Sequence, residues 1–201
     1  MKLWIALGLL PVMIAACSSD AEKSEGTSSS SSGGSSSGEA SSGGSSSGGS
    51  SGLTTTCEGA CRQTTLTITK GATTDAFDRS QFGYEGNDKL FIEVRKGGVT
   101  GCPQQTSADP EFLLNVIVPR ALSSTPIDQS AGAKANFLDL KGTIEEAPQP
   151  PKTTAVTITP IAAKLDGEGQ FLAFDLHAEL ETGAVIDGHV FSSEHCTSLD
   201  D

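Results

Sequence analysis

The sequence predicts an all-β fold, a single antiparallel β-sandwich or small barrel of about eight strands that follows a disordered linker. Short runs rich in β-branched and aromatic residues recur after residue 52, separated by Gly, Pro, Asn and Asp. Several of these runs alternate apolar and polar residues, as strands with one buried face do. No stretch of ten or more residues shows apolar residues at helical spacing.

Composition divides the 201-residue chain into three parts. We interpret residues 1–16 as a signal peptide and residues 17–52 as a lipidated cysteine with a disordered, Ser/Gly-rich tether. Residues 53–201 form a β-rich globular domain that is long enough to bury a core. Serine and glycine cannot bury enough apolar surface to offset the entropy of ordering, so the tether is expected to be a flexible coil spanning roughly 30–35 Å.

The first sixteen residues read MKLWIALGLLPVMIAA, one lysine followed by an apolar run and then small residues. This is the layout of a secretory signal peptide, and it is too short to remain as a membrane-spanning helix. The next feature, Ile14-Ala15-Ala16-Cys17, resembles the bacterial lipobox. The resemblance implies a diacylglyceryl thioether on Cys17, cleavage before it and acylation, for example with palmitate, of the new amino group.

Two or three acyl chains, at roughly 0.8 kcal/mol per buried CH₂, would hold the protein stably on a membrane. The alternative is export followed by release, with Cys17 an incidental residue. In lipoproteins kept at the inner membrane, an aspartate follows the lipidated cysteine. Here that position is Ser18, which resembles lipoproteins sorted to the outer membrane. We therefore expect an exported protein, anchored by lipid to the outer membrane or cell surface.

The expected strands follow one another at short intervals along the domain. They are 64–69, 77–85, 90–95, 112–118, 135–140, 154–159, 170–180 and 185–191. The strand 112–118 is apolar on both faces apart from Asn115, which favours a central strand covered on both sides.

The last two strands predict a hairpin with a defined register. Apolar residues occupy alternate positions of both strands, and a three-residue loop over 181–183, with Gly183 in the left-handed conformation, places both apolar sets on one face. A two-residue loop would place core positions opposite polar ones. In the favoured register His177 lies opposite Asp187, and Asp175 lies opposite His189.

Four cysteines follow Cys17, an even number that indicates two disulfides in an exported domain. Three pairings are possible, and we favour Cys57–Cys61 together with Cys102–Cys196. A zinc site is the alternative, but the spacing does not match the paired knuckles of zinc ribbons.

The polar face of the final hairpin is the candidate site. Asp175, His177, Asp187 and His189 supply two imidazoles and two carboxylates, a set that could bind a divalent metal such as zinc or copper. The simpler interpretation is two solvent-facing cross-strand pairs, each worth a few tenths of a kcal/mol. No cofactor is otherwise expected.

Charge and composition restrict the partners. Residues 53–201 contain 11 Lys or Arg against 21 Asp or Glu, a formal charge of −10 that disfavours nucleic acid and anionic lipid headgroups. The sequence contains no recognisable catalytic set, so we predict a non-enzymatic module that binds an unknown ligand of the cell envelope or extracellular space. A carbohydrate-binding module is a further alternative, weakened because Tyr84 is the domain's only Tyr or Trp.

The layout as a whole resembles surface lipoproteins of soil δ-proteobacteria such as myxobacteria. The features that resemble an uncharacterised domain in such organisms are Phe82-Gly83-Tyr84, Gly97-Gly98, Gly101-Cys102-Pro103, Gly188-His189-Val190-Phe191 and His195-Cys196. This resemblance implies an architecture and a location, and it implies no activity.

Overall fold

Two antiparallel sheets make up the fold of the described residues. A computed structural model of the protein describes residues 52–145 and 149–201, so the predicted signal peptide, Cys17 and the tether up to residue 51 lie outside the described residues. The elements in this part of the chain are η1 (Gly59–Arg62), β1 (Thr67–Lys70), β2 (Thr73–Ala76), β3 (Arg79–Glu85), β4 (Lys89–Lys96), β5 (Phe112–Pro119), β6 (Ile127–Asp128), β7 (Lys134–Asp139), β8 (Thr153–Lys164), β9 (Phe171–Leu180), β10 (Val185–Ser192) and η2 (Thr197–Leu199).

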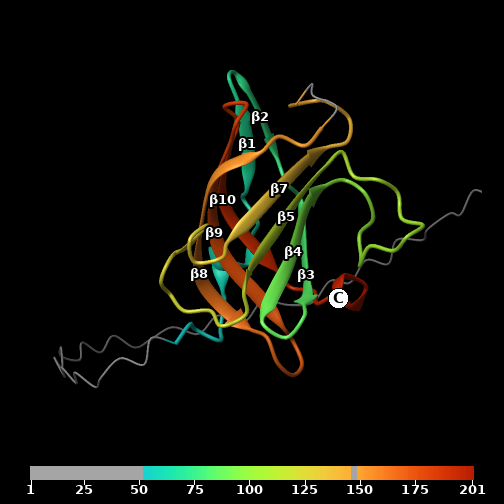
Figure 1. The fold of residues 1–201 in the computed structure, drawn as a ribbon. Coiled ribbons are helices and arrows are strands. Elements are labelled where there is room, and N and C mark those ends of the chain that lie inside the picture. Colours follow the sequence, from blue (N-terminus) through green and yellow to red (C-terminus); the bar gives the residue numbers. More distant parts are fainter. Residues whose placement is uncertain (1–51, 146–148) are drawn as a thin grey trace, which may run out of the picture. The chain divides into compact units, whose positions relative to one another are not determined.

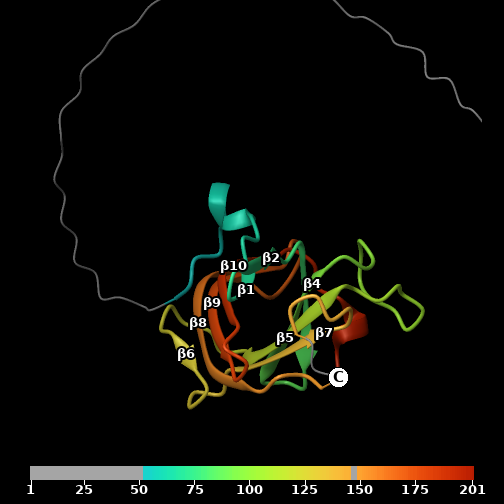
Figure 2. The same ribbon diagram turned by 90° about the horizontal axis from the view of Figure 1, so that it is seen from above.

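The larger sheet has the order β2-β1-β10-β9-β8-β6, and the smaller has the order β3-β4-β5-β7. The two sheets face each other, as Figures 1 and 2 show from two directions. Neither sheet closes on itself, so the fold is a sandwich and not a barrel, and the predicted all-β class is confirmed. The described residues contain ten strands instead of about eight, because β2 and β6, with four and two residues, are too short for the pattern to reveal.

The core lies between the sheets and is built mainly from alternate residues of the strands. Every second residue of β9 from Leu172 to Leu180 is buried, and so are Ile186 and Val190 of β10. Three phenylalanines meet edge-on or tilted in this core, Phe77, Phe112 and Phe137, with ring centroids 5.0–6.4 Å apart. The apolar face predicted for the final hairpin is therefore the inner face of the larger sheet.

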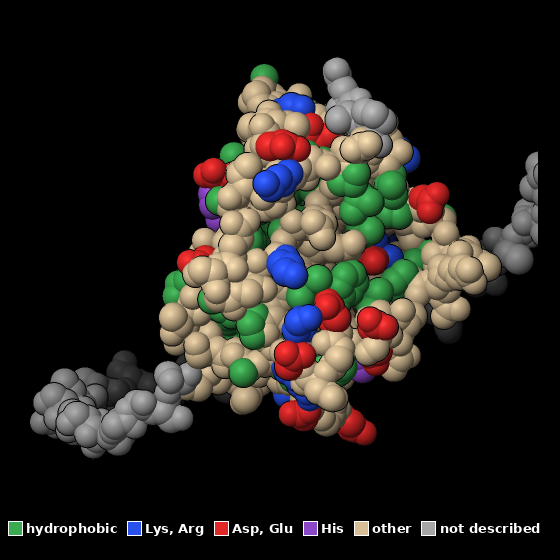
Figure 3. Space-filling model, viewed as in Figure 1, with side chains coloured by type: hydrophobic (Ala, Val, Ile, Leu, Met, Phe, Trp, Pro, Cys, Tyr) green, Lys and Arg blue, Asp and Glu red, His purple; other side chains and the backbone are tan. Residues whose placement is uncertain are grey.

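The strand 112–118 corrects one prediction. As expected, β5 is an interior strand, between β4 and β7. Its second face, however, carries Leu113 and Ile117, which are only half-buried. Figure 3 shows apolar side chains gathered on this outer side. Leu140, the residue after β7, is 50% exposed. The apolar pattern indicated two covering layers, whereas a sandwich supplies only one sheet to cover β5.

The final hairpin has the predicted register. The amide of Leu180 donates to the carbonyl of Ala184 at 2.9 Å, which leaves a three-residue loop, and Gly183 has φ +82°. His177 lies opposite Asp187 and His189 opposite Asp175, as predicted.

Both favoured disulfides are present. Cys57, before η1, is joined to Cys61 within it, and Cys102, in the loop after β4, is joined to Cys196 beyond β10. The C-terminal segment that carries Cys196 runs along the edge of β3, where the amide of Phe82 donates to Glu194 and the amide of Cys196 donates to Phe82. Within residues 52–145 and 149–201, no helix has the length and apolar character needed to cross a bilayer.

Candidate functional site

The outer face of the larger sheet carries a grid of polar side chains. One row crosses four strands as Thr157, His177, Asp187 and Thr67, and the next row contains Thr159, Asp175 and His189. Thr157, Thr159 and the two His–Asp pairs line a shallow depression over β8, β9 and β10. The structure thus brings all four predicted site residues onto one face.

The first pair consists of His177 and Asp187. The Nδ1 atom of His177 is 2.9 Å from Oδ1 of Asp187, and the His177 side chain is 47% exposed. The hydrogen bond to Asp187 raises the pKa of His177, and partial burial of the ring opposes this rise. The other ring nitrogen, Nε2, lies 3.6 Å from Oε1 of Glu179, which is two residues further along the same strand face.

The second pair uses its histidine differently. Nδ1 of His189 is 2.8 Å from Oδ1 of Asp175, and Nε2 is 2.9 Å from the carbonyl oxygen of Cys61. Only 14% of the His189 side chain is exposed. Both ring nitrogens of His189 therefore face oxygen atoms of the protein, and neither is directed at solvent. His189 therefore connects β9 to the disulfide-closed turn that precedes β1.

The four residues pair off and do not converge on one point. Among the described residues, three possible ligand atoms within 4.8 Å of one another occur only at Cys102, Glu194 and Cys196. Those two cysteines share a disulfide, so they offer no thiolate to a metal. The metal hypothesis for all four predicted residues stays a prediction, and a shared ion would have to replace the contacts of His189.

Gly188 shapes this face from below. It lies in β10 between Asp187 and His189 with φ +133°, a backbone conformation that side chains rarely adopt. A Cβ atom there would lie 2.6 Å from the carbonyl oxygen of Thr65, so the glycine lets the chain before β1 approach β10 closely. Packing thus requires a glycine between Asp187 and His189.

The chain before β1 lies over one end of the same sheet. Thr54 bridges Ala162 of β8, and the guanidinium of Arg62 stacks 5.7 Å from the ring centroid of Phe191. We call residues 54–62 the N-terminal cap. The contact between His189 and the Cys61 carbonyl holds this cap on the sheet. The disulfide Cys57–Cys61 closes the cap covalently.

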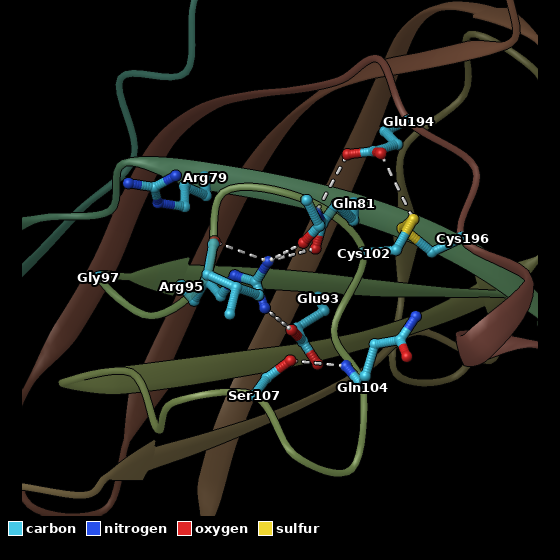
Figure 4. Close-up of polar contacts among 12 residues, drawn as sticks. Arg79, Gln81, Glu93, Arg95, Gly97, Cys102, Gln104, Ser107, Glu194 and Cys196 are labelled. Atoms are coloured by element: carbon cyan, nitrogen blue, oxygen red, sulfur yellow. Dashed lines mark hydrogen bonds and ion pairs between the residues drawn. A yellow bond between two sulfur atoms is a disulfide. The ribbon is translucent and has the colours of Figure 1, made fainter.

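A second polar cluster lies on the outer face of the smaller sheet, where the loop 97–111 lies over it (Figure 4). Arg95, 3% exposed, donates from Nη1 to Glu93 at 3.0 Å. Its Nη2 donates to Gln81 at 2.7 Å and to the carbonyls of Val99 and Gly101 at 3.2 and 2.8 Å. Burial raises the pKa of Glu93, and the charge of Arg95 opposes this rise. The cluster fixes the loop to the sheet.

Sequence reasoning missed this cluster. The alternation of β4 placed Glu93 and Arg95 on the polar side, and polar sides of strands are usually solvated. The sequence contains only a weak indication of the cluster. A glycine pair, Gly97-Gly98, followed by Cys102 indicates a loop that turns back and is held by a disulfide.

Tyr84 does not provide an exposed platform for a sugar. Its ring is half-buried between the guanidinium of Arg120, 4.5 Å from the ring centroid, and the imidazole of His195, with centroids 4.7 Å apart. Its hydroxyl donates to the carbonyl of Leu165 at 2.6 Å. Tyr84 thus contributes to packing between segments, and the carbohydrate alternative loses the residue on which it depended.

Comparison with known proteins gives no match. No family model matches the chain, and no curated protein sequence or solved structure matches it either.

Proposed function

We propose that this protein is an exported lipoprotein, anchored by acyl chains on Cys17, whose β-sandwich acts as a binding module displayed from the membrane. The observation that carries the proposal is the order of residues 1–17, a charged start, an apolar run and a lipobox-like Ile14-Ala15-Ala16-Cys17. Two disulfides in the described residues support export, because such bonds persist in oxidising compartments.

We favour binding over catalysis because of what surrounds the two His–Asp pairs. In the part of the chain that the structure describes, no Ser, Thr or Cys side chain hydrogen-bonds to a histidine nitrogen. A nucleophile activated by His177 or His189 would need such a contact. The open, polar depression beside His177 supports recognition of a small polar or cationic ligand instead.

Metabolic labelling with palmitate tests the anchor in cells that produce the full chain. The wild-type protein is expected to take up label and to partition with membranes, and Cys17→Ala is expected to lose both properties. The double variant Cys57→Ala/Cys61→Ala is the matched control, because it removes two cysteines and should keep the label. Undiminished label in Cys17→Ala would end the lipoprotein proposal.

A further inference from the structure

The hydrogen bond from His177 to Asp187 fixes the orientation of the imidazole. When Nδ1–H donates to the Asp187 carboxylate at 2.9 Å, the neutral ring carries its lone pair on Nε2. Histidines that ligate metals through Nε2 are commonly oriented by a carboxylate on the other nitrogen in this way. Asp187 is thus placed as a positioning residue for a ligand atom that faces the open depression.

A carboxylate stands at metal-ligand spacing from that nitrogen. Nε2 of His177 and Oε1 of Glu179 are 3.6 Å apart, longer than the 2.7–3.2 Å typical of an N–H···O hydrogen bond. Two ligands held about 2.0–2.1 Å from a tetrahedral ion are separated by about 3.4 Å. The observed separation matches the spacing of two ligands on one ion. Without an ion, Asp187 raises the pKa of His177, and Glu179, which interacts directly with the protonated ring, raises it further.

The other two histidines do not offer the same arrangement. Nε2 of His189 is 2.9 Å from the Cys61 carbonyl, so a metal there would have to displace the N-terminal cap. Nε2 of His195 is 3.0 Å from Asp200, and its ring packs against Tyr84. The side chains of His177 and Glu179 are 47% and 54% exposed, so an ion can approach them without moving any backbone segment.

We propose that His177 and Glu179 form an open site for a divalent transition metal, zinc or copper, with Asp187 orienting the imidazole. The protein supplies two ligands, and water or a small anionic ligand fills the remaining positions, as in sites that keep an open coordination. Imidazole with carboxylate suits Zn²⁺ and Cu²⁺ among divalent ions, and the order of affinities favours Cu²⁺. The formal charge of −12 on the chain also attracts cations.

This site differs from the four-residue set predicted from the sequence. It uses one histidine of that set, replaces both of its ligating aspartates by Glu179, and leaves His189 with the N-terminal cap. It does not depend on acylation of Cys17, so its failure and the failure of the anchor are separate outcomes.

Calorimetric titration of the full chain in detergent with ZnCl₂ and with CuCl₂, at mildly alkaline pH, tests the proposal. One ion per chain is expected, with the affinity reduced at least about tenfold in His177→Gln and in Glu179→Gln. Asp187→Asn should lower the affinity by about 10-fold to 100-fold, the usual cost of losing an orienting partner. His195→Gln is the matched control and should bind as the wild type does.

Nitrogen NMR of the imidazoles gives a second readout that does not depend on heat. The chain contains three histidines, so the signals can be assigned with single variants. Before metal is added, neutral His177 should be the Nδ1–H tautomer, and Zn²⁺ should shift its Nε2 signal more than those of His189 and His195. Absence of heat in the wild type would overturn the proposal, as would equal binding by His177→Gln or a dominant shift at His189.

Discussion

The outer faces of the two sheets each carry a segment tied by a disulfide, and the two segments are held by different side chains. On the smaller sheet, the loop 97–111 is held by Arg95, which is 3% exposed and bonded to two side chains and two loop carbonyls. On the larger sheet, the N-terminal cap is held by His189, which is 14% exposed and makes two contacts. The first attachment is buried, and the second lies at the rim of an open depression.

This difference separates a structural face from a candidate binding face. Removing Arg95 would leave Glu93, Gln81 and loop carbonyls unsatisfied beneath a covering loop, whereas the polar groups around His177 remain in contact with water. A buried charge is tolerated only with its partners in place, so the smaller sheet cannot change without loss of stability. The face of the larger sheet can accept a ligand at little cost to the fold.

Removing the disulfides is expected to give the largest difference between the two faces in the free energy of unfolding. Cys102–Cys196 closes a sequence separation of 94 residues and Cys57–Cys61 closes one of 4. Loop entropy predicts losses in the free energy of unfolding of about 4.7 kcal/mol for Cys102→Ser/Cys196→Ser and about 2 kcal/mol for Cys57→Ser/Cys61→Ser. Urea denaturation of the full chain measures both, and equal losses would contradict the ranking.

Two arginines, one from each outer face, provide the next comparison. Arg95→Ala is expected to lower the free energy of unfolding by about 3–5 kcal/mol, because Glu93 stays buried without its counter-ion. Arg62→Ala, on the cap, removes an exposed stacking contact with Phe191 worth about 0.5–1 kcal/mol. The same urea experiment compares them, and an Arg95→Ala loss as small as that of Arg62→Ala would show that the loop 97–111 does not need its ion.

The final hairpin was predictable because its determinants are local. Alternation in β9 and β10 identifies the buried face, and Gly183 identifies the loop, so the register of His177 and His189 follows from a short stretch of sequence. The disulfide pairing was favoured but not fixed by the sequence. A tight turn between Cys57 and Cys61 favours joining these two, which leaves Cys102 to pair with Cys196.

The contacts that distinguish the two outer faces were not predictable, because they join distant parts of the chain. His189 contacts a carbonyl 128 residues away, and Gln81 contacts Glu194 across 113 residues. Alternation places Arg95 and His189 on polar faces alike, and it contains no information about which polar face a loop will cover. The role proposed for Glu179 likewise rests on side-chain distances that a pattern of charges does not supply.

The smallest expected effect is a pH dependence at His177. Its pKa is raised by the hydrogen bond to Asp187, so the folded state binds the proton more tightly than the unfolded state does. The pair therefore stabilises the fold fully below the unfolded pKa of about 6.5, and the stabilisation is lost as pH rises through the higher folded pKa. Because the ring is 47% exposed, solvent screening limits the effect to a few tenths of a kcal/mol.

NMR titration of the imidazoles can resolve so small a contribution where denaturation cannot. In the wild-type chain the pKa of His177 should lie above 6.5, its usual value, and Asp187→Asn should bring it down toward that value. Lys89→Ala, at an exposed position of the smaller sheet, is the control and should leave the pKa of His177 unchanged. An unchanged pKa of His177 in Asp187→Asn would mean that Asp187 does not orient the ring. The proposed metal site would then lose its positioning residue.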